Sequence, residues 1–119
     1  MAVAIPRPGS ETIVSAALAI EVGPSSETCV VRLLGELDLA SSNVLQEHLM
    51  RILESNIRML VIDLDGLEFI DSTGLYALLR VTQRARRDRD QLRIIEPSGQ
   101  VRRLLRLTEL DAALPLISR

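Results

Sequence analysis

The sequence predicts an α/β domain in which a mixed sheet of four to five strands has helices packed against it. Three observations support this class. After two initial β-type runs, short apolar strands alternate with amphipathic helical stretches, the pattern of strands joined by helical crossovers. The 119 residues fit one domain. Hydrophobic residues make up 47% of the chain and aromatic residues only 2%, so we expect an aliphatic core.

The N-terminal region divides into a lead-in and a pair of strands. Residues 1–15 contain Pro6, Pro8 and Gly9, and we expect them to form a mobile lead-in before a folded domain at residues 16–119. Residues 16–22 and 27–34 are β-type runs separated by a Gly-Pro-Ser-Ser connector. This pattern predicts an antiparallel hairpin.

A helix and a central strand follow. Residues 41–56 begin with Ser41 and Ser42, either of which can cap a helix. The apolar positions of this segment recur on one helical face: Leu45, Leu49, Ile52 and Leu53. Residues 59–64 are almost continuously apolar, which predicts a strand buried on both faces near the centre of the sheet.

The C-terminal half repeats the alternation. Residues 67–71 lead into Ser72-Thr73-Gly74, after which leucines at helical spacing predict a helix to about Arg89. Residues 92–95 form another strand-like run. Ser98 can cap a third helix with Val101, Leu104 and Leu105 on its apolar side. Residues 114–117 contain Pro115, so only an edge strand is expected there.

Composition excludes several classes of function. All 14 basic side chains are arginine, so a P-loop lysine, a Schiff base and a lysine general base are excluded. The net charge of −2 offers no positive field for nucleic acid. One cysteine, Cys29, and one histidine, His48, cannot supply a structural zinc site. We expect no metal and no cofactor.

Nothing in the sequence predicts a membrane segment. The apolar stretch at residues 12–20 is bounded by Glu11 and Glu21 and is shorter than the ~20 residues that a spanning helix needs. It also lacks the basic region that precedes the apolar part of a signal peptide. We therefore expect a cytoplasmic protein.

Two enzymatic interpretations are weak. Asp63-Leu64-Asp65-Gly66 resembles the nucleophile motif of haloacid-dehalogenase-type phosphatases, but Leu67 replaces the expected threonine and no lysine can balance a phosphoaspartate. A strand end followed by an Asp-Gly turn explains the motif better. Ser72 lacks a plausible histidine base, since His48 lies in the middle of the first predicted helix. We expect no catalytic residue and no enzyme.

The Asp71-Ser72-Thr73-Gly74 turn is the main functional candidate. A serine at a strand-to-helix junction is exposed, and free N–H groups of the first helical turn lie beside it. A phosphate on Ser72 could be held by the amides near Gly74 and Leu75. The alternative is that Ser72 or Thr73 is only a helix N-cap.

Three segments resemble the STAS domain, the family of anti-sigma factor antagonists. Residues 31–38 (VRLLGELD) are similar to its second-strand motif, residues 61–79 (VIDLDGLEFIDSTGLYALL) to its signature, and residues 97–111 (PSGQVRRLLRLTELD) to its third helix and following turn. The resemblance covers about residues 16–117 and implies a STAS-like fold.

The resemblance also implies site residues. In the family that the chain resembles, a partner kinase phosphorylates the serine after the Asp of the D-S-[ST]-G motif, and this position maps to Ser72. Thr73 maps to the neighbouring hydroxyl, which is usually not the acceptor. Asp38 and Asp71 would lie near the acceptor loop and help to engage the kinase. Tyr76 departs from the small residue that is frequent at its position, so partner choice can differ. Independently of the resemblance, helical spacing on the second long helix places an outward strip at positions Ser72, Tyr76, Arg80, Gln83 and Arg87, which we expect to be a docking face. For the arginines alone, a solvated polar face is the favoured alternative. The predicted partner-binding residues are Asp38, Asp71, Thr73, Gly74, Tyr76 and Arg80.

The resemblance implies a transcription regulator that works by partner switching, as in a stress response. Unphosphorylated, the protein would bind an anti-sigma serine kinase and release the sigma factor. Phosphorylation of Ser72 would end this binding, and a phosphoserine phosphatase would restore it. The alternative is a STAS scaffold or interaction subunit of a larger complex, for example a transport-associated one, that is not phosphorylated.

Overall fold

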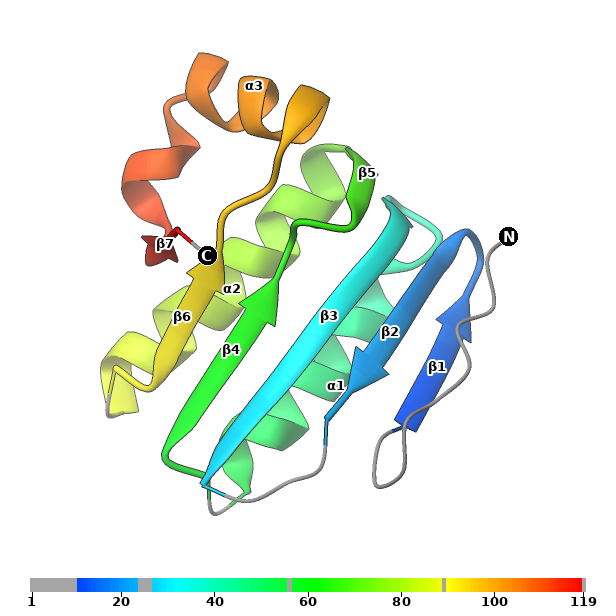
Figure 1. Ribbon diagram of the computed structural model, residues 1–119. Coiled ribbons are helices and arrows are strands. Elements are labelled where there is room, and N and C mark those ends of the chain that lie inside the picture. Colours follow the sequence, from blue (N-terminus) through cyan, green and yellow to red (C-terminus); the bar gives the residue numbers. More distant parts are fainter. Residues whose placement is uncertain (1–10, 24–26, 56, 89, 119) are drawn as a thin grey trace.

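The computed structural model describes residues 11–23, 27–55, 57–88 and 90–118. In this part of the chain a seven-stranded mixed sheet carries two long helices on one face, and Figure 1 shows both helices behind the strands. The α/β class with helices packed against a mixed sheet is confirmed. The sheet has more strands than the four to five that the sequence predicts.

The first three strands form an antiparallel meander. β1 (Glu11–Ser15) pairs with β2 (Leu18–Val22), and β2 pairs with β3 (Thr28–Leu37). The second pair confirms the predicted hairpin, whose connector at residues 24–26 lies outside the described residues.

The other strands run parallel to β3. β4 (Met59–Asp63) pairs with β3 on one side and with β6 (Leu92–Ile95) on the other, so it is the central strand that its apolar run predicts. β7 (Leu116–Ile117) pairs with β6 and is the short edge strand predicted near the C-terminus.

The start of the domain differs from the prediction. Residues 11–15, assigned above to the mobile lead-in, form β1, in which a β-branched Thr-Ile-Val triplet favours the extended conformation. Ile13 lies opposite Ile20 of β2 and packs against the core. The boundary predicted at residue 16 is therefore wrong, and residues 1–10 lie outside the described residues.

β5 (Leu67–Ile70) is the second strand that the sequence does not identify. It pairs with the last residues of β3, beyond the stretch of β3 that β4 occupies, and the register shifts between Gly35 and Glu36. Four residues are too few to show a clear strand alternation. The pairing exists because β3 is ten residues long and extends past β4.

Three helices confirm the three that the sequence predicts: α1 (Ser42–Glu54), α2 (Ser72–Asp88) and α3 (Gly99–Leu107). A short 3-10 helix, η1 (Leu110–Ala113), follows α3. The helix ends predicted at Asn56 and Arg89 lie outside the described residues. α1 and α2 contact each other, and α3 packs at the end of the sheet against β5 (Figure 1).

The core lies between the sheet and the pair α1 and α2. Alternate strand residues meet the apolar faces of the two helices, and the fully buried members include Leu33, Leu49, Ile62, Leu78 and Ile94. As the helical spacing predicts, α2 buries Leu75, Leu78 and Thr82 and partly buries Leu79. This orientation leaves the opposite face of α2 exposed along its length. Over the described residues, none of the helices combines the length and the apolar character that a bilayer-spanning helix requires.

Candidate functional site

Two loops meet where β3 and β5 end. The loop between β3 and α1 spans residues 38–41, and Asp71 joins β5 to α2. The main-chain N–H of Asp71 donates to the carbonyl of Leu37 (3.1 Å), and Asp71 Oδ2 accepts from the N–H of Leu39 (3.1 Å). These two bonds bring the predicted residues Asp38 and Asp71 to the same edge of the sheet.

The Asp71 carboxylate caps α2. Its Oδ1 accepts from the Thr73 hydroxyl (2.5 Å) and from the N–H of Gly74 (3.0 Å), while the Asp71 carbonyl accepts from the N–H of Leu75 (3.0 Å). The hydrogen bond from the Thr73 hydroxyl, helped by the N–H groups of Gly74 and Leu39, lowers the pKa of Asp71 below its usual value. The N-cap of α2 is therefore an ionised aspartate, and neither Ser72 nor Thr73 caps the helix by its own hydroxyl.

This cap corrects one expectation. The amides of Gly74 and Leu75, expected to hold a phosphate on Ser72, already donate to Asp71. A phosphoryl group at this position would also face the negative charge of the Asp71 carboxylate. The start of α2 is thus a poor anion site, because its own aspartate occupies it.

The two hydroxyls of the turn differ in their surroundings. The Thr73 hydroxyl is bound to Asp71, and its side chain is half-buried. Ser72 is exposed, and its hydroxyl makes no hydrogen bond with any described residue. Ser72 is therefore the hydroxyl of this turn that is available to a reagent from outside.

Gly74 is fixed by a close approach of α2 to β3. A Cβ at this position would lie 2.7 Å from Leu37 Cγ, 2.8 Å from the Leu37 carbonyl oxygen and 2.9 Å from Ile70 Cγ1. Only a glycine lets the first turn of α2 lie this close to the end of β3. Gly74 is one of the predicted partner-binding residues, but it is buried and is covered by its own domain. Its role is to support the turn from within.

Asp38 organises the turn that leads into α1. Its Oδ1 accepts from the N–H of Ala40 (3.0 Å), and its carbonyl accepts from the N–H groups of Ser41 and Ser42. Ser41 stands at the N-cap position of α1, but its hydroxyl bonds within the turn instead, accepting from the N–H of Asp38 (3.1 Å). Ser98 likewise occupies the N-cap position of α3 without a side-chain cap bond. The predicted side-chain caps at Ser41 and Ser98 are thus not formed.

An open groove of about 430 Å³ lies next to Ser72, between the first turns of α1 and α2. We call it the acceptor groove; it is lined by Leu39, Ser42, Asn43, Gln46, Ser72, Thr73, Tyr76, Ala77 and Arg80. Tyr76 is 63% exposed and Leu39 is 72% exposed, so two large apolar side chains face solvent here. Exposed aromatic residues next to a groove are typical anchors for a protein partner.

The predicted strip along α2 is confirmed as a surface. Its five residues, Ser72, Tyr76, Arg80, Gln83 and Arg87, are all exposed.

The sequence does not predict the α1 side of the groove. Asn43 and Gln46 are three residues apart on α1, a spacing that places them on one face, but nothing local in the sequence links that face to Ser72.

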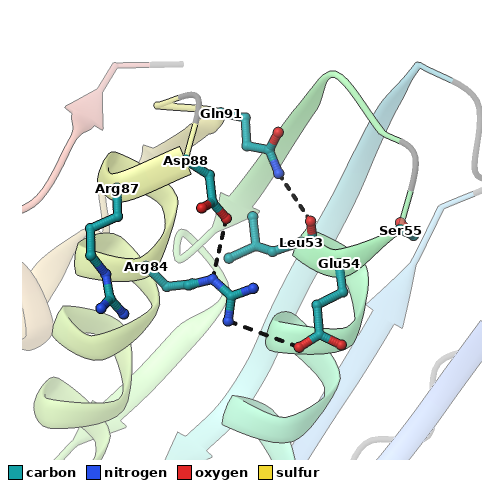
Figure 2. A pocket seen from close by; sticks show the side chains of 7 residues that line it. All are labelled: Leu53, Glu54, Ser55, Arg84, Arg87, Asp88 and Gln91. Carbon is teal, nitrogen blue, oxygen red and sulfur yellow. Dashed lines mark hydrogen bonds and ion pairs between the residues drawn. The ribbon is translucent and has the colours of Figure 1, made fainter.

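A second pocket lies at the other ends of α1 and α2, and Figure 2 shows how its side chains hold those ends together. Arg84 lies between Glu54 of α1 and Asp88 of α2, with nitrogen-to-oxygen distances of 3.9 and 3.2 Å. The buried Gln91 donates to the carbonyl of Leu53 (3.2 Å). These polar groups bind one another, so we interpret this pocket as a structural junction between the helices.

Asp63, the residue that a phosphatase would need as nucleophile, has a structural environment. It is 1% exposed, its Oδ2 accepts from Arg32 Nε (3.4 Å), and its Oδ1 accepts from the N–H of Asp65 (2.9 Å). This is the strand end followed by an Asp-Gly turn that the sequence favours. Among the described residues, no group of three or more His, Cys, Asp or Glu side chains is placed to hold a metal ion.

Comparison with known proteins agrees with this architecture. The sequence model of the STAS domain matches residues 19–119. An anti-sigma factor antagonist from Mycobacterium paratuberculosis has a TM-score of 0.72 and 24% identity, over 97% of this chain and 92% of that chain. The antagonist SpoIIAA, in its unphosphorylated form, has a TM-score of 0.69 and 20% identity, over 84% of this chain and 87% of that chain. The Bacillus SpoIIAA in its phosphorylated form has a TM-score of 0.65 and 20% identity, over 84% of this chain and 90% of that chain.

A similar domain occurs within a much larger protein. The murine anion transporter solute carrier 26 family member A9 has a TM-score of 0.62 and 16% identity, over 80% of this chain and only 17% of that chain. At these identities the solved structures establish a shared fold.

Proposed function

Because the chain belongs to the STAS domain family, we propose that it is an anti-sigma factor antagonist whose phosphoacceptor is Ser72. In its unphosphorylated form it binds an anti-sigma serine kinase, and this binding releases the sigma factor. Phosphorylation of Ser72 ends the interaction. The protein is then a substrate and a ligand of the kinase, with no catalysis of its own.

The observation that carries this proposal is the contrast between Ser72 and Thr73. Both hydroxyls lie in one turn, but only Ser72 is exposed and has no hydrogen-bond partner among the described residues. The relatives described as anti-sigma factor antagonists give independent support, since one of them, SpoIIAA, is known in an unphosphorylated and a phosphorylated form.

The acceptor groove gives the kinase a place to dock beside its target. Tyr76 and Leu39 offer apolar area, and the neutral polar side chains of Asn43 and Gln46 can form hydrogen bonds across an interface. Asp38 and Asp71 act mainly by holding the two loops in register. Their role in kinase binding is then to position the loop.

The chemistry of the switch is a phosphoryl transfer in which the kinase supplies ATP and Mg²⁺. The Ser72 Oγ forms a bond to the γ-phosphorus, the bond to the β,γ-bridging oxygen breaks, and the serine proton passes to a base of the kinase. The product carries a charge of about −1.5 to −2 at neutral pH. A partner surface that closes over this loop would have to desolvate that charge beside Asp71, which weakens binding.

The reset requires a separate phosphatase that removes the phosphoryl group from Ser72. We place the protein in the cytoplasm, because its proposed partners act on transcription there.

The test is a kinase assay with the full chain. Candidate anti-sigma kinases and ATP are mixed with the protein, and the phosphorylated residue is mapped by mass spectrometry. Phosphorylation should be lost in Ser72→Ala and kept in Ser98→Ala, a matched control because Ser98 is also an exposed serine at the start of a helix with no cap bond of its side chain. Modification that persists in Ser72→Ala would rule out the assignment.

A second function rests on the likeness to the solute carrier 26 transporter, in which a similar domain is part of a larger chain. In this alternative the protein is a scaffold subunit of a transport-associated or other complex, and Ser72 is not modified. A pull-down experiment distinguishes the two proposals. If the protein is a scaffold, the wild type, the Ser72→Ala variant and the Ser72→Glu variant should all bind the complex equally well.

A further inference from the structure

Among the described residues, the lining of the acceptor groove includes a single charged side chain. Of the residues that line it, Arg80 is a cation and the others are neutral. Ser42, Asn43, Gln46 and Tyr76 add hydroxyl and amide groups that can donate hydrogen bonds. A concave surface with one guanidinium, several neutral donors and no carboxylate suits an anion with several oxygens, such as a phosphoryl group.

Arg80 has no carboxylate partner among the described residues. Its Cζ lies 5.8 Å from the centre of the Tyr76 ring, at a distance typical of a cation–π contact. Arg84, four residues later on the same helix, differs because Glu54 and Asp88 hold its guanidinium (Figure 2). The donors of Arg80 are therefore available to an anion.

The helix directs Arg80 towards Ser72. Ser72, Tyr76 and Arg80 are spaced four residues apart and so lie on one face of α2. The Cα atoms of Ser72 and Arg80 are roughly 12 Å apart along the helix, at about 1.5 Å per residue. Long helical side chains lean towards the N-terminus of their helix, so a guanidinium over the Tyr76 ring lies about one turn nearer to Ser72 than its own Cα. An arginine and a phosphoserine can together span the remaining distance.

The other side of Ser72 disfavours the same anion. The carboxylate of Asp71 repels it, and the amides of Gly74 and Leu75 are engaged by Asp71. A phosphoryl group on Ser72 is thus repelled from the loop and attracted by the groove. Both forces act in the same direction.

We infer that the acceptor groove is an intramolecular binding site for the phosphoryl group on Ser72, in which Arg80 forms the ion pair. This inference rests on the proposed function for the choice of Ser72 as acceptor. The inference adds a mechanism to the proposed function. The phosphorylated side chain of Ser72 fills the groove and binds Tyr76 and Arg80. Phosphorylation then blocks the docking surface as well as adding negative charge to it.

The test uses protein that carries genetically encoded phosphoserine at position 72, so no kinase is needed. The second ionisation of the phosphoryl group is followed by ³¹P NMR as a function of pH. A paired guanidinium stabilises the dianion, so the apparent pKa should be lower in the parent protein than in Arg80→Gln by several tenths of a pH unit. Arg87→Gln is the matched control, because Arg87 is an exposed arginine of α2 that lies roughly 22 Å from Ser72 along the helix axis. Its titration should match that of the parent.

A second readout follows the side chain itself. The ¹⁵N–¹H signal of Arg80 Nε should move when phosphoserine replaces serine at position 72, and the signal of Arg87 should not. Equal titration curves for the parent and Arg80→Gln, or an unchanged Arg80 signal, would overturn the inference. A failure of every kinase to modify Ser72 would contradict the proposed function instead, since neither NMR measurement uses a kinase.

Discussion

The Asp71 carboxylate accepts a hydrogen bond from the main-chain N–H of Leu39, which lies 32 positions earlier in the chain. The same side chain caps α2 through the Thr73 hydroxyl and the N–H of Gly74. One carboxylate thus joins the turn before α1 to the first turn of α2, the two elements that form the walls of the acceptor groove. The shape of the proposed docking surface depends on this link.

Replacing Asp71 by asparagine should therefore cost stability in a pH-dependent way. The pKa of Asp71 is lowered in the folded protein, mainly by the Thr73 hydroxyl. Its ionised form then contributes stability that is fully present above the unfolded pKa of about 3.9 and is lost as the pH falls through the lower folded value. We expect Asp71→Asn to be about 1–2 kcal/mol less stable than the wild type at pH 7, because the amide loses the charge and keeps only one of the two acceptor oxygens that bond Leu39, Thr73 and Gly74. This difference should narrow below about pH 4.

Urea unfolding at pH 7 and pH 3 measures this effect. Asp65→Asn serves as the control, because it removes an exposed carboxylate for which the described residues show no side-chain hydrogen bond or ion pair. A stability difference between wild type and Asp71→Asn that is the same at both pH values would show that the ionised cap is not the cause.

Replacing Gly74 by alanine should destabilise the fold. The new Cβ would meet the Leu37 carbonyl oxygen at 2.8 Å, and a strand backbone cannot move away easily. The steric cost of about 1–3 kcal/mol exceeds the gain of about 1 kcal/mol or less from better helix propensity. Thermal unfolding measures the outcome. Gly23→Ala is the matched control, since its Cβ would make only an ordinary contact, at 3.5 Å from the Val30 carbonyl oxygen. An equally large loss of thermal stability in Gly23→Ala would contradict the steric explanation.

A permanent negative charge at position 72 should separate binding from folding. Ser72 is exposed, so Ser72→Glu should change the free energy of unfolding by no more than about 0.5 kcal/mol. Kinase affinity should fall about tenfold or more, because the charge lies in the surface that the kinase must cover. Calorimetric titration with the kinase measures the affinity, and Ser72→Gln shows the effect of size without charge. Loss of folding in Ser72→Glu, or equal affinities of the two variants, would count against the switch.

The parts of this site that the sequence predicts are the local ones. The Asp-Ser-Thr-Gly turn and the exposed strip of α2 follow from residue types and helical spacing within one segment. The α1 side of the groove does not, because the bond between Asp71 and the Leu39 N–H joins two distant segments.

The sequence-based prediction that the Gly74 and Leu75 amides would hold a phosphate on Ser72 was wrong for a related reason, because these amides donate to Asp71. Aspartate, serine and threonine are all good N-caps, and pattern alone does not decide which of them bonds the first turn. β5 escaped prediction because it pairs with a part of β3 whose length only the folded sheet defines.

The last prediction concerns Tyr76, an exposed aromatic residue that lines the acceptor groove. Tyr76 is 63% exposed and its ring lies beneath the Arg80 guanidinium, so it contributes little to the core of its own domain. Tyr76→Ala should leave the free energy of unfolding within about 0.5 kcal/mol of the wild type. It should weaken kinase binding by about 2 kcal/mol, which is roughly thirtyfold, because the ring is an anchor of the proposed docking surface. Tyr76→Phe keeps the ring and should retain most of the affinity, and Gln83→Ala, on the same strip but outside the groove, should bind like the wild type. Surface plasmon resonance measures the kinase affinity of these three variants. A larger loss of affinity in Gln83→Ala than in Tyr76→Ala would contradict the prediction and would place the docking surface further along α2, away from the acceptor groove.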